Sequence, residues 1–244
     1  MTYRSIVGSL LFISLCTRPD IATAVNILAR HSDTYGPAHI KELLRVVGYL
    51  FTTQDLGVTY HKQAPKDVNR PTIMEGAHHP TKDLVAYCDA DYAGATDFRS
   101  TSGYVIFMNG GPVTWSSRIQ KLTAQSTSEA ECVAACECVK EVLHLRLLLS
   151  ELGYSHLCKE PTDIMEDNAA CTAFAHNLKN RRSAKHYVVR IRFLQEQTLE
   201  NKTVRFVQTP SARQISDILT KPLPKVQFQK LRDQLLGITP LAQK

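Results

Sequence analysis

The sequence has little that could cross-link a protein through disulfides or a structural metal. It contains seven cysteines, an odd number, and no two of them form a Cys-x-x-Cys pair. This pattern argues against a disulfide framework and a zinc ribbon, so we expect free thiols in a reducing compartment. Cys132, Cys136 and Cys138 fall within a segment of helical periodicity. We interpret them as small buried side chains.

Long apolar runs are also missing. No stretch approaches the roughly 20 consecutive apolar residues that a membrane-spanning helix requires. The chain nevertheless has 244 residues and a hydrophobic content of 43%, which are enough to bury a substantial core. We therefore expect a soluble protein that has no membrane partner.

Charge is unevenly distributed along the chain. Residues 1–169 carry 15 Lys/Arg and 19 Asp/Glu, whereas residues 170–244 carry 14 and 4. A basic segment that follows acidic clusters is typical of a protein that binds a phosphate backbone on one side and holds cations on another. A solvated basic face is the simpler alternative that charge alone leaves open.

The first quarter of the sequence predicts helices. Residues 3–54 read as three helices, with Pro19 and Pro37 at positions where a first helical turn tolerates proline. A short strand is expected at Gly57–His61. Three prolines and little apolar periodicity then indicate a linker. The four expected segments are a helical unit at 1–62, the linker at 63–82, a folded domain at 83–223, and a C-terminal helix and tail at 224–244.

From Leu84 onward the pattern changes to short apolar runs. Three runs separated by turn residues, including Asn109-Gly110, predict an antiparallel meander. A long helical pattern at 128–152 follows, with Ser126 among its possible caps. Later segments predict further strands at 164–166 and 203–208 and helices at 188–199 and 213–221. This order indicates an α/β fold, a mixed five-stranded sheet flanked by helices and preceded by a small helical appendage.

Four acidic residues stand where this fold would bring them together. Asp89 ends the first strand, Glu131 is expected in the first turn of the long helix, Asp167 ends a later strand, and Asp217 lies on a late helix. The carboxyl ends of parallel strands and the adjoining helix termini line one crevice, so these side chains can converge. Convergent carboxylates suit Mg²⁺, although acidic residues at element ends are more often helix caps.

Short motifs surround these acids in a fixed order along the chain. They are Tyr87-Cys88-Asp89-Ala90-Asp91-Tyr92-Ala93-Gly94, Arg99-Ser100-Thr101-Ser102-Gly103-Tyr104, Ser128-Glu129-Ala130-Glu131, Asp167-Asn168, Lys185-His186 and Asp217-Ile218-Leu219-Thr220-Lys221-Pro222-Leu223. The series resembles the RNase H domain of copia-type retrotransposon Pol polyproteins. The upstream segments Tyr3-Arg4-Ser5-Ile6-Val7-Gly8 and Thr17-Arg18-Pro19-Asp20 resemble the end of the same family's reverse transcriptase.

The resemblance implies an RNase H-like fold and endonucleolytic hydrolysis of RNA in an RNA·DNA hybrid. The family's four carboxylates fall on Asp89, Glu131, Asp167 and Asp217, which would hold two Mg²⁺ ions, or Mn²⁺, as catalytic and metal-binding residues. Two neighbours compete with this assignment. Asp91 is an alternative to Asp89, and Glu129 is an alternative to Glu131. We prefer Asp89 because it directly follows the apolar run, and Glu131 because its following residues match the family better.

The resemblance also implies partners and a location. The expected partners are an RNA·DNA hybrid and the rest of the reverse transcriptase, and the expected location is the cytoplasm, within a virus-like particle, or the nucleus. A basic stretch would follow the hybrid's backbone. Its candidate residues are Lys179, Arg181, Arg182, Lys185, His186 and Arg190. For His186, a structural hydrogen bond is the preferred alternative.

Two departures from the family pattern bear on activity. The polymerase's Tyr-x-Asp-Asp motif is absent, so we expect no polymerase activity in this chain. Val188 also stands where the family commonly has an acid after the Lys-His pair. A catalytically inactive transposon remnant that at most binds nucleic acid therefore remains the alternative function.

Overall fold

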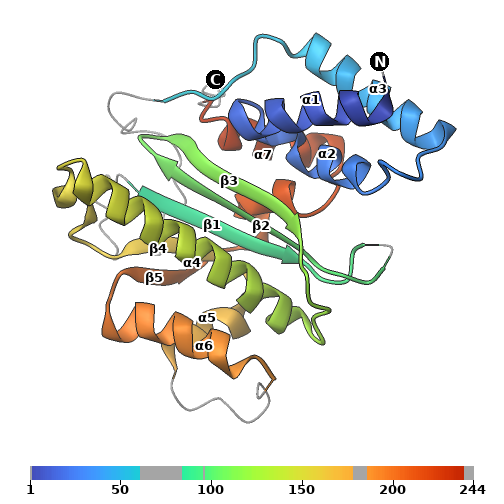
Figure 1. Ribbon diagram of the computed structural model, residues 1–244. Helices are drawn as coiled ribbons and strands as arrows, with labels where there is room; N and C mark the ends of the chain where they lie inside the picture. The colour runs from blue at the N-terminus through green and yellow to red at the C-terminus, as the bar shows by residue number, and fades with distance from the viewer. Residues whose placement is uncertain (1, 61–83, 96, 178–185, 239–244) are drawn as a thin grey trace.

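The computed structural model describes residues 2–60, 84–95, 97–177 and 186–238. At its centre is a five-stranded sheet with the order β3-β2-β1-β4-β5, as Figure 1 shows. The strands are β1 (Leu84–Asp91), β2 (Thr101–Met108), β3 (Gly111–Ile119), β4 (Thr162–Glu166) and β5 (Val204–Gln208). The first three strands pair antiparallel, and β4 and β5 continue the sheet in parallel with β1. The predicted mixed five-stranded sheet with flanking helices is confirmed.

A tight turn sets the register of the β2–β3 hairpin. Asn109 and Gly110 both have positive φ, 51° and 76°. Two consecutive left-handed residues match the right-handed twist of a hairpin, which is why an Asn-Gly pair favours this turn. The predicted turn is therefore confirmed. The turn pairs Met108 with Gly111 at the start of the β2–β3 ladder. On its other side, β2 pairs with β1, where Gly103 lies opposite Asp89.

One face of the sheet is covered by α4 (Thr127–Glu151), α5 (Ala169–His176) and α6 (Val188–Gln195), which ends in a π-helical turn at Glu196–Glu200. The side chain of Ser126 caps α4 by accepting a hydrogen bond from the backbone of Glu129. The expected burial of the three clustered cysteines of α4 is confirmed, since they pack in the core between this helix and the sheet. The core on this face therefore depends on small side chains.

The opposite face carries the C-terminal elements. Residues 213–221 were expected to form one helix. The structure instead has the short 3₁₀ turn η6 (Ile215–Leu219) there, preceded by another at Ser211–Arg213. The helix α7 (Lys225–Leu235) follows and packs against η6. Leu219, Leu231 and residues of β1 and β2 form the core on this side. The late acidic residue Asp217 is thereby held on a short buried turn.

The three predicted N-terminal helices are present. They are α1 (Tyr3–Cys16), α2 (Ala22–Ala29) and α3 (Pro37–Thr52), and they share a small core of their own. Figure 1 shows them beside α7, on the side of the sheet away from α5 and α6. Hydrogen bonds join them to β3: the Trp115 indole donates to the carbonyl of Ser14 at 2.8 Å, and the Asn26 amide donates to that of Ser117 at 2.7 Å. The helical unit is therefore packed against the sheet.

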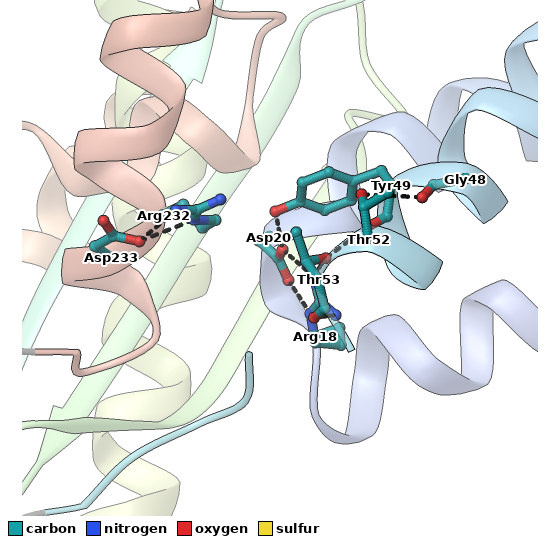
Figure 2. Close-up of polar contacts among 8 residues, drawn as sticks. All are labelled: Arg18, Asp20, Gly48, Tyr49, Thr52, Thr53, Arg232 and Asp233. Atoms are coloured by element: carbon teal, nitrogen blue, oxygen red, sulfur yellow. Dashed lines mark hydrogen bonds and ion pairs between the residues drawn. The ribbon is translucent and has the colours of Figure 1, made fainter. Parts of the chain in front are cut away.

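A buried ionic network ties the helical unit together beside α7 (Figure 2). The Arg18 guanidinium donates to both carboxylate oxygens of Asp20, at 2.9 and 2.8 Å, and both side chains are almost fully buried. The Tyr49 hydroxyl donates to Asp20 at 2.7 Å. Burial, and next the negative charge of Asp20, raise the pKa of Tyr49 to about 12. Its ring also packs edge-on against Phe228 of α7, which joins the network to the C-terminal helix.

Two further expectations concern residues around the linker. The strand expected at Gly57–His61 is wrong for its described part, because residues 57–60 belong to no strand. The Thr59 amide instead donates to the carbonyl of Leu236 at 2.8 Å. The expected linker at 63–82 lies outside the described residues. Among the helices in the described ranges, none combines the length and the apolar character needed to cross a membrane.

A candidate carboxylate metal centre

Two of the candidate acids reach the same place because their strands are parallel neighbours. Tyr87 of β1 pairs with Met165 of β4. Asp89 and Asp167 each lie two residues beyond this pair, so they stand level with one another at the same edge of the sheet. Side chains two residues apart point to the same face of a strand. The parallel register thus brings together two acids that are far apart in sequence.

Glu131 of α4 completes a group of three. One oxygen from each of Asp89, Glu131 and Asp167 lies within 4.8 Å of the other two. Asp89 and Glu131 are buried, and Asp167 is partly exposed. Glu131 was expected in the first turn of its helix, but α4 begins at Thr127 and Glu131 therefore lies in the second turn. Its carboxylate lies over the end of β1, where the backbone amide of Ala90 donates to it.

Glu129, the alternative to Glu131, has other partners. Its Oε2 accepts hydrogen bonds from the backbone amide of Gln125 at 2.7 Å and faces the Nε2 atom of His186 at 3.0 Å. Two residues apart on a helix, Glu129 and Glu131 face different directions. Glu129 is consequently bound to the start of α4 and to the segment before α6, outside the group of three.

Asp91, the alternative to Asp89, also lies outside the group. It occupies the last position of β1, half-buried, where a close approach by Gly94 keeps it in place. A β-carbon on Gly94 would come within 1.8 Å of the Oδ2 atom of Asp91. Asp89 instead accepts a short hydrogen bond from the Thr220 hydroxyl at its Oδ2 atom. Both aspartates of this motif lie near the charges of Lys221 and Asp217, but only Asp89 belongs to the group of three.

Asp217 approaches the group from the opposite side and is paired with a lysine. Its Oδ1 atom lies 2.8 Å from Nζ of Lys221, and the same ammonium lies 3.8 Å from Oδ2 of Asp89. Asp217 is not among the three acids whose oxygens lie within 4.8 Å of one another. The structure thus arranges the four candidate acids as a triad, with Asp217 beside Asp89 and both of them near the ammonium of Lys221.

Burial and the negative charges of neighbouring acids make Asp89 and Glu131 hard to ionise. Burial raises the pKa of Asp89 to about 7; the positive charge of Lys221 opposes this rise, and Asp217 adds to it. For Glu131, burial and then the negative charges of Glu166, Asp89 and Asp167 move the pKa far above its usual range. Bringing several carboxylates together in a buried site favours their protonated forms unless a cation is present.

Glu166 is a fifth acid that the sequence did not single out. It is fully buried at the end of β4, where its Oε1 atom accepts from the Asn168 amide at 3.0 Å and the Cys88 thiol donates to its Oε2 atom at 3.3 Å. Burial is the main cause that raises its pKa to about 8. Its place as the last residue of a strand, directly after the apolar pair Ile164-Met165, was the sequence signal that could have identified it.

The donor set suits a hard divalent cation. Oε2 of Glu131 is buried and has no hydrogen-bond partner among the described residues. An orphaned buried carboxylate oxygen is costly, and a cation beside it would remove the cost. Mg²⁺ prefers oxygen ligands and keeps several waters, so three carboxylates with one side partly open to solvent fit it.

The candidate nucleic-acid contacts belong to a basic stretch that the structure describes only from His186 onward. Lys179, Arg181, Arg182 and Lys185 lie outside the described residues. His186, which follows them, is about 40% exposed and contacts Glu129 at 3.0 Å, which agrees with the preferred structural hydrogen bond. Arg190 lies half-buried on α6, and its carbonyl accepts from the Cys136 thiol at 3.7 Å. The described part of the basic stretch therefore starts beside the first turn of α4, where His186 contacts Glu129.

Comparison with known sequences finds close relatives. The retrovirus-related Pol polyprotein from transposon RE2 of Arabidopsis thaliana is 34% identical over 228 residues, covering 93% of this chain and 14% of the relative. That from transposon TNT 1-94 of Nicotiana tabacum is 32% identical over 237 residues, covering 97% of this chain and 16% of the relative. The chain thus spans less than a fifth of the length of either relative. No protein-family model matches the chain.

Solved structures give a weaker likeness. LC11-RNase H1, isolated from compost by a metagenomic approach, is 14% identical with a TM-score of 0.43, covering 57% of this chain and 93% of that one. The same enzyme in complex with an RNA/DNA hybrid is 15% identical with a TM-score of 0.41, covering 56% and 93%. The fold is therefore described by its own sheet order, β3-β2-β1-β4-β5 with helices on both faces, and these weak likenesses add nothing to it.

Proposed function

Because the chain belongs to the copia-type family of retrotransposon Pol polyproteins and has an RNase H-like fold, we propose that it hydrolyses the RNA strand of RNA·DNA hybrids with divalent cations. The observation that carries the proposal is the group formed by Asp89, Glu131 and Asp167, with its orphaned buried oxygen. Carboxylates that converge in this way are suited to cation-assisted phosphodiester hydrolysis, because that chemistry needs little else from the protein.

Each acid has a distinct role in the proposal. Asp89 and Glu131, both buried and on rigid elements, would fix the position of Mg²⁺ or Mn²⁺. Asp167, which is partly exposed, would face the scissile phosphate, and Asp217 would complete the shell from η6. A bound divalent cation would supply an activated water and stabilise the leaving oxygen.

Hybrid binding is assigned to the surface beside the basic stretch. The relative LC11-RNase H1 has been solved with an RNA/DNA hybrid, which supports the same class of ligand here. Lys179, Arg181, Arg182, Lys185, His186 and Arg190 remain the proposed backbone contacts. Lysine and arginine contacts to phosphates position a nucleic acid without reading its sequence, so we propose little sequence preference.

The test is cleavage of a labelled RNA strand in three contexts: paired with DNA, paired with RNA, and alone. We expect cleavage only in the hybrid, only with Mg²⁺ or Mn²⁺, and none after chelation. Glu131→Gln should abolish it. Glu137→Gln is the matched control, since Glu137 lies on the same helix, is exposed and pairs with Lys140.

A folded protein that binds the cation and the hybrid but leaves the RNA intact would contradict the proposal. The chain would then be the alternative, a catalytically inactive transposon remnant that at most binds nucleic acid. The Val188→Asp variant separates the two cases further. Restored cleavage in that variant would show that the missing acid after the Lys-His pair had silenced the wild-type chain.

A further inference from the structure

Lys221 is the one cation that the described residues place inside the carboxylate group. Its Nζ lies 2.8 Å from Oδ1 of Asp217 and 3.8 Å from Oδ2 of Asp89. Both carboxylate side chains are nearly inaccessible to water, at 5% and 4% exposure, whereas the lysine side chain is 36% exposed. The ammonium thus enters a buried acidic site from the solvent side.

The backbone around Lys221 is firmly held. Its amide donates to the carbonyl of Asp217 at 3.2 Å, and the preceding Thr220 donates its hydroxyl to Asp89. Gly103 of β2 packs so closely that a β-carbon there would meet Thr220 at 2.6 Å. With the main chain fixed in this way, the flexible part of residue 221 is its four-carbon side chain, which has open access to water.

We propose that the Lys221 ammonium is a built-in counter-cation that occupies the place of a second divalent ion between Asp89 and Asp217 and is displaced into solvent when that ion binds. The identity of the displaced group follows from geometry: an ammonium within 4 Å of both carboxylates takes the same position as a cation that bridges them. The identity of the ion rests on the proposed function.

The charges in the site explain why both states are stable. Without a divalent ion, Lys221 offsets the repulsion between two buried carboxylates. A divalent ion with its waters offsets more of that charge, and the released ammonium regains hydration at little cost because its side chain already reaches the surface. Binding of the ion at Asp217 is therefore weakened by competition with Lys221, whereas binding at Glu131 and Asp167 is less affected.

The experiment measures Mn²⁺ binding by titration calorimetry on the full chain after chelation. Lys221→Met removes the charge and keeps the length of the side chain, and Lys221→Arg keeps the charge. Lys225→Met is the matched control, since Lys225 is exposed at the start of α7 and takes part in none of the ion pairs described here. Asp89→Asn provides a variant in which the site itself is impaired.

We expect Lys221→Met to bind Mn²⁺ on the order of tenfold more tightly, because a like charge within 4 Å has been removed from the ion's site. Lys221→Arg and Lys225→Met should bind as the wild type does. The metal-free Lys221→Met protein should also melt at a lower temperature than the metal-free Lys225→Met protein, and Mn²⁺ should reverse the difference.

Unchanged or weaker Mn²⁺ binding in Lys221→Met would overturn the proposal, and so would tighter binding in Lys225→Met of the same size. If the wild type binds no Mn²⁺, Lys221→Met must bind it, or the proposal is wrong. The proposed function fails separately: a chain that binds Mn²⁺ more tightly in Lys221→Met yet cleaves no hybrid would retain this inference and lose that one.

Discussion

The hydroxyl of Thr23 in α2 donates a 2.7 Å hydrogen bond to the backbone carbonyl of Ile218, which lies 195 residues later. Ile218 belongs to η6, directly after Asp217. Thr23 is buried, so this contact takes place away from solvent. The N-terminal helices therefore support the turn that carries the fourth candidate acid.

Replacing Thr23 with Val should test that support. The variant keeps the shape of the side chain but leaves the buried Ile218 carbonyl without this donor, which should cost about 1–3 kcal/mol of unfolding free energy. Urea unfolding measures the loss. Thr52→Val is the control, because the exposed Thr52 hydroxyl only bonds within its own helix. An equal loss in both variants would show that the contact to η6 is not special.

Gly103→Ala should disturb the site through packing. A β-carbon at Gly103 would lie 2.6 Å from Thr220 and 2.9 Å from Leu219, so the last turn of η6 must move away from β2. We expect a loss of roughly 1–3 kcal/mol in stability, as overpacking in a core typically gives, together with weaker Mn²⁺ binding.

Gly48→Ala is the matched control for that substitution. Gly48 lies inside α3 with nothing within 4 Å of an added β-carbon. The helix should gain up to about 1 kcal/mol from the loss of glycine's backbone freedom. Thermal melting and Mn²⁺ titration of both variants distinguish them, and intact Mn²⁺ binding in a stably folded Gly103→Ala protein would contradict the prediction.

Stability of the metal-free protein should fall as pH rises. The pKa of Asp89 is raised to about 7 and that of Glu166 to about 8 in the folded state, whereas unfolded carboxyls titrate near pH 4. The folded protein thus binds more protons than the unfolded chain between these values. The contribution of these two carboxyls to the unfolding free energy is therefore greatest below about pH 4. It declines as pH rises and is lost once pH passes the folded pKa values.

Urea unfolding at several pH values between 5 and 8, with a chelator present, measures this decline. For a shift of this size it should amount to a few kcal/mol, on the order of 1.4 kcal/mol for each pKa unit. Asp89→Asn should flatten the profile, and excess Mg²⁺ should restore stability most at pH 8. The same steep decline in Asp89→Asn would mean that other groups cause it.

Asp217 and the basic stretch should affect separate steps of hybrid cleavage. Asp217→Asn removes a charge from the cation's surroundings while keeping the side-chain size, so cleavage should fall by orders of magnitude with little change in hybrid affinity. Neutralising Arg181, Arg182 and Lys185 should weaken binding and lower the salt slope by up to roughly one unit for each lost phosphate contact. Single-turnover cleavage and hybrid titration distinguish the two effects. Unchanged cleavage in Asp217→Asn would remove this residue from the site.

The elements with local signals could be predicted from the order of residues. The Asn109-Gly110 pair favoured left-handed backbone, the short apolar runs predicted the strands, and apolar residues at helical spacing predicted the long helix. The order of those elements in turn placed Asp89 and Asp167 at strand ends that share an edge. Local propensity was insufficient at Gly57–Tyr60, where the Thr59 amide bonds to the carbonyl of Leu236 and residues 57–60 form no strand.

The groups that surround the acids became known from the packing of whole elements. The contacts of Lys221 with Asp89, of Cys88 with Glu166 and of Thr23 with Ile218 join residues separated by 78 to 195 positions. Such contacts depend on how whole elements pack, because no local pattern records which side chain meets which across a sheet or a helix interface. The same packing sets burial, and burial is the main reason that the carboxyl pKa values of this site are raised.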